Sequence, residues 1–267
     1  MIVWLDGCLC PVEEARIDPA DRGFTLGDGL YETIRARDGK PLRLAAHFAR
    51  LQSGAGALGI PLPYADRMLA AAMTTVLSVN ALTDGVLRLT LTRGPAPRGL
   101  ASPASAQPTL LISAAPPPAP LPPARVIVAT CTRRNELSPT TRFKTLNMLD
   151  SILARREAEQ RGADDALLLN GAGRLAEATA ANLFLVIDGE VVTPPAADGA
   201  LPGVMRGDVL DRLAAVAAPL TPGDFAVASE AFLTNANGIR AVVAVDGKAV
   251  GSGEIGPVTL RLKAAVD

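Results

Sequence analysis

The chain is divided by the stretch Pro116-Pro117-Pro118-Ala119-Pro120-Leu121-Pro122-Pro123. Proline has no amide hydrogen to donate and its ring restricts φ, so residues 116–123 can form neither a helix nor a central strand. We expect an extended, semi-rigid connector at this point. It predicts a small N-terminal domain over residues 1–115 and a larger domain over residues 124–267, both of ordinary domain size.

On the N-terminal side of the connector, the hydrophobic pattern predicts both strands and helices. Alternating apolar residues indicate strands over residues 31–37 and 86–92, and Asp38-Gly39 is a hairpin signal. Apolar residues at helical spacing indicate helices over residues 44–58 and 64–82.

On the C-terminal side, strands are expected over residues 125–130, 166–169 and 182–187. A helix is expected around Leu146, Leu149, Ile152 and Leu153, which fall on one helical face, and further helices over residues 204–217 and at the chain's end. Because strands and helices mix without a strict βαβ order, the predicted class is α+β.

Composition excludes several functional classes. The 267 residues carry a formal net charge of -1 and are 49% hydrophobic, which argues against a disordered chain and against a nucleic-acid binder. The sequence has no apolar run long enough for a membrane span and no signal-peptide pattern at its start, so we expect a cytoplasmic protein with no membrane partner. Three cysteines without a C-x-x-C pair argue against a metal site and a disulfide framework.

His47 is the single histidine, and no G-x-S-x-G elbow accompanies it. A Ser-His-Asp triad is therefore disfavoured, and we expect His47 to lie on a helix surface or at an interface. Catalysis would then rest on lysine, carboxylates, tyrosine or a cofactor.

Lys144 is the most prominent candidate, because apolar Phe143 and Leu146 flank it where a loop meets a helix. Apolar surroundings favour the neutral amine of a lysine, which is a nucleophile toward a carbonyl carbon. A second candidate is Glu177, in a small, apolar stretch between two strands. A carboxylate is costly there unless it has a positive partner. Taken alone, Lys144 is more simply a lysine at a helix start whose ammonium reaches solvent.

Taken together, these two residues and further motifs resemble the class IV aminotransferases, the pyridoxal-phosphate enzymes of fold type IV. The resemblance covers essentially the whole chain, with the motifs in register. They are an N-terminal signature at residues 21–33, His47-Phe48-Ala49-Arg50-Leu51, the two segments around Lys144 and Glu177, Leu201-Pro202-Gly203-Val204-Met205-Arg206, and Phe232-Leu233-Thr234-Asn235-Ala236-Asn237-Gly238. The family implies a small N-terminal α/β domain and a larger C-terminal α/β pseudo-barrel domain.

The resemblance also implies the roles of single residues. Lys144 would hold the aldehyde of pyridoxal 5'-phosphate and move the substrate proton, and Glu177 would keep the pyridine nitrogen protonated. The phosphate would be bound by Arg50, by the backbone amides of Val204 and Met205, and by Thr234, Asn235 and Ala236. Met205 stands where the family usually has threonine, so a hydroxyl contact is missing there. The family's sites lie near a dimer interface, which implies a homodimer acting on a small-molecule amine or carboxylate.

Substrate choice is less determined. Tyr31 and Arg98 match positions on the substrate side of the D-amino acid enzymes, but Leu100 replaces the histidine that helps them hold a carboxylate. No tyrosine follows Lys144 as it does in the branched-chain enzymes. The motifs favour 4-amino-4-deoxychorismate lyase. A D-amino acid or branched-chain amino acid transaminase is the alternative, and a non-catalytic vitamin-binding module is a remote one.

Overall fold

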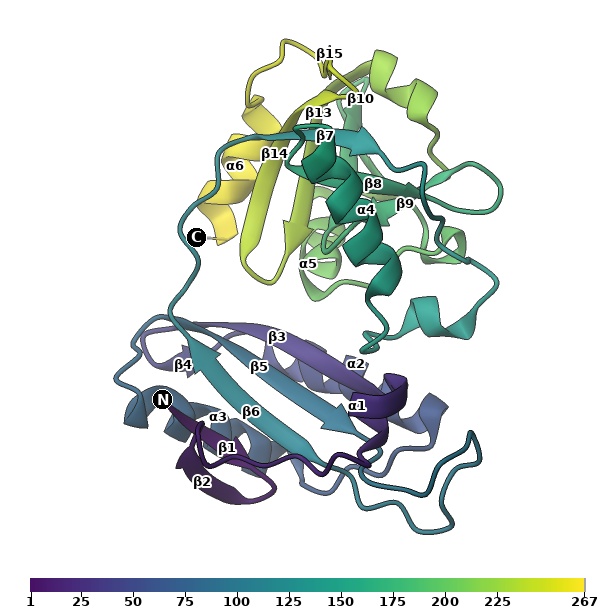
Figure 1. Ribbon diagram of the computed structural model, residues 1–267. Coiled ribbons are helices and arrows are strands. Elements are labelled where there is room, and N and C mark those ends of the chain that lie inside the picture. Colours follow the sequence, from purple (N-terminus) through teal and green to yellow (C-terminus); the bar gives the residue numbers. More distant parts are fainter. Residues whose placement is uncertain (267) are drawn as a thin grey trace. The chain divides into compact units, whose positions relative to one another are not determined.

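A computed structural model describes residues 1–266 and contains two compact units (Figure 1). The first consists of Met1–Pro118 together with Phe143–Asn147, and the second of Ala119–Arg142 together with the chain from Met148 onward. The chain passes from one unit to the other inside the proline-rich connector. That each unit also folds as an independent domain stays a prediction.

The first unit is built on a six-stranded antiparallel sheet with the strand order β2-β1-β6-β5-β3-β4. The longest pairing joins β3 to β5, which runs without a register shift over the whole of β5. The strands are β1 Ile2–Leu5, β2 Cys8–Pro11, β3 Gly29–Arg37, β4 Lys40–Pro41, β5 Gly85–Thr92 and β6 Leu110–Ala115. The hairpin expected at Asp38-Gly39 joins β3 to β4 and is confirmed.

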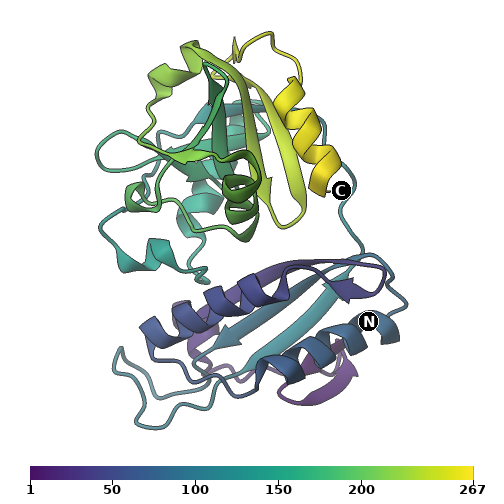
Figure 2. The ribbon, with the colours of Figure 1, turned by 180° about the vertical axis from the view of Figure 1, so that it is seen from behind.

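Helices α2, Leu44–Leu58, and α3, Asp66–Val79, cover one face of this sheet (Figure 2). The bounds of α2 are those predicted, and α3 is shorter than predicted by a few residues at each end. Apolar residues of both helices pack against the even-numbered side chains of β3 and the odd-numbered ones of β5, such as Ile34 and Leu89. A short helix, α1 Arg22–Leu26, precedes β3.

Residues 143–147 return to the first unit and lie against the start of β3. The Tyr31 N–H donates to the Lys144 carbonyl at 2.9 Å, and the Leu146 N–H donates to the Gly29 carbonyl at 3.0 Å. Leu30 and Thr145 form an antiparallel bridge between these two bonds. This return of the chain, which positions Lys144, had no signal in the sequence pattern.

The second unit is built on a nine-stranded mixed sheet with the order β12-β11-β10-β13-β14-β7-β8-β9, in which β15 also pairs with β14. Parallel pairs join β7 to β8 and to β14, and most of the other pairs are antiparallel. The strands are β7 Ala124–Val128, β8 Asp165–Leu169, β9 Leu175–Ala178, β10 Asn182–Ile187, β11 Glu190–Thr193, β12 Val216–Ala217, β13 Ala228–Asn235, β14 Gly238–Val245 and β15 Lys248–Ala249.

Three α-helices and three short 3-10 helices accompany this sheet in the part of the chain that the structure describes. They are α4 Leu149–Gln160, α5 Val204–Leu213, α6 Pro257–Val266, η1 Pro139–Arg142, η2 Ala196–Asp198 and η3 Pro222–Ala226. Helix α4 packs on β8, α5 packs on β13, and α6 packs on β14 and β13. The helix expected over residues 204–217 ends early, because Ala214 takes a left-handed φ of 47° and Val216–Ala217 pair with β11 as a strand.

The predicted α+β class is confirmed, since both units combine a sheet with separate helices. Among the described residues, no helix combines the length and the apolar character that crossing a membrane requires.

Candidate active site

Lys144 lies over the ring of Tyr31 in the first unit. Its Nζ is 4.5 Å from the ring centroid, and the backbone of the two residues is joined by the hydrogen bond that holds the return segment to β3. Lys144 is half-buried, and Tyr31 is buried. The structure therefore brings together two residues predicted from distant parts of the sequence, on the face of the sheet opposite α2 and α3.

Arg88 is a further cation at this place that the sequence analysis did not select. It lies on β5, with its guanidinium carbon 4.0 Å from the centroid of the Tyr31 ring. The only signal was its position in the alternation of β5, where the flanking Leu87 and Leu89 are buried and Arg88 is exposed. Arg88 thus adds a guanidinium beside Tyr31 and Lys144, a group suited to a substrate that carries a carboxylate.

Arg50 projects from α2 onto a buried carboxylate of β3. Its Nε donates to Glu32 Oε1 at 2.8 Å and its Nη2 to Glu32 Oε2 at 2.5 Å. His47 Nδ1 lies 2.7 Å from Glu32 Oε2. Of the two places expected for His47, the helix surface is wrong: His47 is 3% exposed, because one turn before Arg50 it faces the same carboxylate. Its place at an interface stays a prediction.

Glu32 is ionised in spite of its burial. Desolvation by itself raises the pKa of Glu32, but hydrogen bonds and positive charge from Arg50 and His47 outweigh it, so the pKa lies below the ordinary 4.5. Neighbouring residues of a strand point to opposite faces of the sheet. The pair of Glu32 with Arg50 consequently lies on the helix-covered face of β3, and Tyr31 with Lys144 on the other.

Arg98 and Leu100 lie on the loop of residues 93–108, which joins β5 to β6. Both are exposed, and Leu100 is 82% exposed although it is apolar. This loop therefore exposes both an arginine and an apolar side chain to solvent.

Glu177 lies in the second unit, within strand β9 and not between two strands as predicted. Arg134 supplies the positive partner that its position requires, with Nη2 2.9 Å from Glu177 Oε1. The Leu201 N–H donates to Glu177 Oε2 at 2.9 Å. Arg134 also donates from Nε to the Gly199 carbonyl at 3.2 Å. Sequence analysis missed Arg134, because nothing in its own segment points to a carboxylate so far along the chain.

Asn182 fixes the backbone that leads into α5. Its Nδ2 donates to the Leu201 carbonyl at 2.8 Å, and a Cβ on Gly203 would come within 2.0 Å of its Oδ1. Glycine is therefore required at 203. The next two residues, Val204 and Met205, open the helix, where first-turn amides have no partner in their own helix and attract anions.

Thr234 is the neighbour of Asn182 in the sheet, since the two residues are opposite each other in the β10–β13 register. It is 1% exposed, and its Oγ1 has no hydrogen-bond partner among the described residues. A buried hydroxyl without a partner is costly unless a ligand completes it. Asn235 and Ala236 follow at the turn into β14, where the Asn237 N–H donates to the Asn235 side chain at 2.9 Å.

Comparison with known proteins shows the family of the chain. The family model for amino-transferase class IV matches residues 29–245. The chain belongs to this family. A D-alanine aminotransferase of Bacillus licheniformis is 29% identical over 272 residues, which span 100% of this chain and 96% of that protein.

Solved structures of the family share its fold. The 4-amino-4-deoxychorismate lyase of Pseudomonas aeruginosa is 34% identical with a TM-score of 0.86, covering 99% of this chain and 97% of that one. The T.th. branched-chain amino acid aminotransferase with pyridoxamine 5'-phosphate is 27% identical with a TM-score of 0.91, covering 99% and 92%. The expected fold-type-IV architecture is confirmed, and this class IV chain is a pyridoxal-phosphate-dependent enzyme.

The Glu32 cluster generates a prediction about stability and pH. A carboxylate whose pKa is depressed in the folded protein contributes stability above its unfolded pKa and loses it as the pH falls through the folded pKa. Glu32→Gln should therefore lower the free energy of unfolding at pH 7 by about 3 kcal/mol, because it leaves buried cations without their partner. The difference between wild type and variant should shrink as the pH falls below 4.5.

Urea unfolding followed by circular dichroism between pH 7 and the acid limit of folding measures this difference. The exposed carboxylate of Glu14 supplies a control, since Glu14→Gln should be neutral throughout. A difference in the free energy of unfolding between wild type and Glu32→Gln that stays constant with pH would contradict an ionised Glu32 in the folded protein.

Proposed function

We propose that this class IV enzyme is a 4-amino-4-deoxychorismate lyase, which releases pyruvate and leaves 4-aminobenzoate for folate synthesis. The observation that carries the proposal is the exposed Leu100 next to Arg98 on the loop of residues 93–108. A small amino acid needs polar ligands for its carboxylate, whereas a ring-shaped dicarboxylate can combine one arginine with apolar contacts. The similarity to the Pseudomonas aeruginosa lyase supports it.

The second unit has hydrogen-bond donors that suit the phosphate of the cofactor. Thr234 has a buried hydroxyl without a partner, and the first turn of α5 has backbone amides that can donate. Gly203, which precedes α5, leaves no side chain beside these amides. We propose that Thr234, Asn235, Ala236, Val204 and Met205 bind the phosphate there. The family resemblance would add the Arg50 guanidinium to this set, held in place by Glu32.

Pyridoxal phosphate, when bound, supplies an aldehyde and an electron-accepting ring. Lys144 would hold the aldehyde through its amine and later carry the substrate proton as a general base and acid. Glu177 would hold a proton on the ring nitrogen. Arg134 and the Leu201 amide fix both of its carboxylate oxygens, so its direction is set before the cofactor binds.

On the substrate side, we propose Arg98 as the ligand of a carboxylate and Tyr31 as a wall beside Lys144. Asn147 occupies the region where branched-chain enzymes have a tyrosine. Its Nδ2 donates to the Gly27 carbonyl at 3.2 Å, so this side chain supports the backbone before β3 instead of presenting a phenol.

A D-amino acid or branched-chain transaminase is the second candidate, and Arg88 favours it. A guanidinium stacked on Tyr31 could hold the carboxylate of an amino acid without help from the loop. Two of the relatives described above are aminotransferases, one for D-alanine and one for branched-chain amino acids.

We further propose a homodimer as the working form. The apolar face of α4 is exposed at Leu149, Ile152 and Leu153, and the helix turns Ser151, Ala154 and Ala158 to its own unit instead. Exposed apolar residues spaced along one helix face are typical of an interface.

Borohydride reduction tests the role of Lys144. The purified enzyme should be yellow, and reduction should attach the cofactor covalently to Lys144, as peptide mapping by mass spectrometry would show. Lys144→Ala should lose turnover yet bind the cofactor reversibly, because the proposed phosphate ligands lie elsewhere. A label found on Lys40, Lys248 or Lys263 would contradict the assignment.

Replacement of Glu177 tests the ring-nitrogen contact. Glu177→Gln keeps the shape but removes the charge, so kcat should fall by about 10²-fold or more while the cofactor is retained. Steady-state kinetics together with the visible absorbance of the bound cofactor measure both effects. The control is Glu190→Gln at the exposed start of β11, and wild-type turnover in Glu177→Gln would return Glu177 to a structural role.

A substrate panel separates lyase from transaminase. Aminodeoxychorismate should yield pyruvate over many turnovers without an added keto acid, because elimination regenerates the starting form of the enzyme. D-alanine or L-leucine with 2-oxoglutarate should react much more slowly. Fast amino-acid reactions together with an inert chorismate derivative would replace the lyase by the transaminase.

A further inference from the structure

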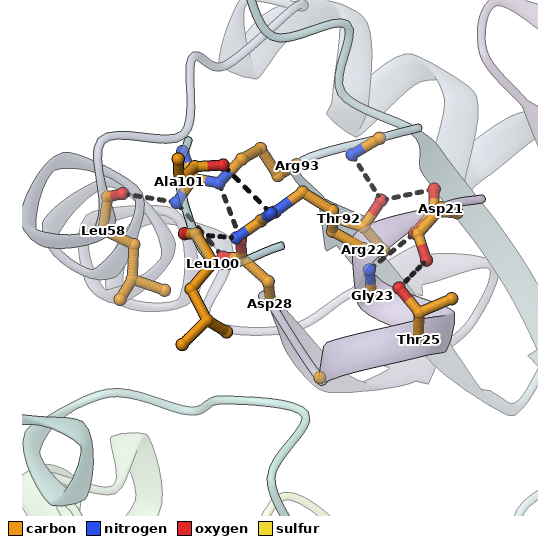
Figure 3. A network of polar contacts seen from close by, with 12 residues as sticks. Asp21, Arg22, Gly23, Thr25, Asp28, Leu58, Thr92, Arg93, Leu100 and Ala101 are labelled. Carbon is orange, nitrogen blue, oxygen red and sulfur yellow. Dashed lines mark hydrogen bonds and ion pairs between the residues drawn. The ribbon is translucent and has the colours of Figure 1, made fainter. Parts of the chain in front are cut away.

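The loop of residues 93–108, which carries Arg98 and Leu100, has almost no apolar anchor of its own. Within residues 94–108, all of which the structure describes, no apolar side chain is buried. A loop of this length without packed side chains would ordinarily be mobile. Its conformation must therefore come from polar contacts, and these come from the segment of residues 20–28 (Figure 3).

Asp21 joins the two ends of the loop. Its Oδ2 accepts hydrogen bonds from Thr92 Oγ1 at 2.8 Å and from Thr109 Oγ1 at 2.7 Å, and the residue is fully buried. The threonines are the residues at either side of the loop, so one carboxylate closes its stem.

Backbone bonds fix the first residues above the stem. The Arg22 N–H donates to the Gly94 carbonyl at 2.9 Å, and the Ala96 N–H donates to the Ala20 carbonyl at 3.2 Å. Gly94 has a φ of +83°, and a Cβ there would lie 1.8 Å from the Gln107 carbonyl oxygen. The two arms of the loop thus touch at this glycine.

The Arg22 side chain holds the tip. Its Nη1 donates to the carbonyls of Gly99 at 3.0 Å and Ala101 at 3.2 Å, and its Nη2 donates to the Leu100 carbonyl at 3.3 Å. Three successive carbonyls of an exposed segment therefore converge on the guanidinium of a residue that is only 5% exposed. The guanidinium spreads its donors over three nitrogens, so it reaches these three carbonyls while Nε donates to Asp28. A lysine ammonium has three donors on a single nitrogen and cannot make all four bonds.

Asp28 in turn holds Arg22. Its Oδ2 accepts from Arg22 Nε at 2.8 Å and from Arg93 Nε at 2.7 Å. Arg93 also donates to the carbonyls of Leu58 at 2.7 Å and Gly59 at 2.9 Å, at the C-terminal end of α2. Burial by itself raises the pKa of Asp28, but the two arginines outweigh it and hold that pKa below its ordinary value. The carboxylate stays ionised and connects the loop tip to a packed helix.

We propose that Arg22 is a positioning residue for substrate binding, because it fixes the backbone of residues 99–101, which include Leu100 and directly follow Arg98. This inference rests on the proposed function insofar as that function assigns Arg98 and Leu100 to the substrate side. Displacements of about 1 Å at substrate-contacting groups change rates strongly, so release of the tip should alter substrate binding more than the chemical step.

Two variants of the holoenzyme separate the roles of Arg22. Arg22→Gln removes both the positive charge and the planar guanidinium. Arg22→Lys removes the guanidinium but keeps a positive charge beside Asp28, so it serves as the test if Arg22→Gln fails to fold. The control is Arg16→Gln, because Arg16 also donates to carbonyls, of Glu13 and Ala15, but only within its own exposed turn.

The first measurement is trypsin cleavage of the Arg98–Gly99 bond, followed by mass spectrometry of the fragment that begins at Gly99. Cleavage should be about tenfold faster or more in both Arg22 variants than in wild type and the control, at a temperature where circular dichroism is unchanged. This measurement needs no substrate, so its outcome does not depend on whether the enzyme is a lyase or a transaminase.

The second measurement is steady-state kinetics with whichever substrate of the panel the wild type turns over. KM should rise by about tenfold in Arg22→Lys with kcat within about twofold and cofactor absorbance retained. Unchanged trypsin resistance in Arg22→Lys would overturn the inference. Faster cleavage with KM unchanged would overturn it as well, since Arg22 would then hold the loop without affecting substrate.

Discussion

A carboxylate taken out of water needs compensating partners, and in this protein arginine neutralises three of the carboxylates that shape the candidate site. Glu32 is bound by Arg50, and Glu177 by Arg134. Asp28 is shared between two further arginines at the foot of the loop after β5. An uncompensated buried charge costs several kcal/mol, so these pairs determine where the charged groups can lie.

This constraint separates two tasks on one strand. Side chains of a strand alternate between faces, so β3 directs Glu32 to the helices and Tyr31 to the opposite side. On the face covered by the helices, Glu32 binds Arg50. On the other face, Tyr31 contacts Lys144, whose segment pairs with β3. Adjacent residues of β3 therefore contact different partners without competing for space.

In the second unit, the register of the sheet positions the candidate site residues. Pairing of β10 with β13 sets Asn182 opposite Thr234, and Asn182 in turn requires a glycine before α5. These backbone contacts involve no substrate. The chain is similar to a lyase and to aminotransferases alike. Differences among such enzymes should accordingly lie in loops such as that of residues 93–108, whose shape depends on a few polar contacts.

The sequence pattern predicted those elements that are determined by interactions between residues close together in the chain. The bounds of α2 follow from apolar spacing, the turn at Asp38-Gly39 from φ preferences, and the strand over residues 182–187 from its apolar run. The α+β class and the family also follow from the sequence, since the motifs around Lys144 and Glu177 occur in order along the chain.

Tertiary structure alone decided which charges meet. Arg134 reaches Glu177, Arg22 reaches the carbonyls of residues 99–101, and buried His47 reaches Glu32 across distances in sequence that no periodicity encodes. The return of residues 143–147 to β3 likewise depends on a strand far earlier in the chain. Composition and spacing report the preference of a residue for water or for a helix, but the partner of a buried charge is chosen by the fold, because desolvation acts on the assembled neighbourhood and not on the segment.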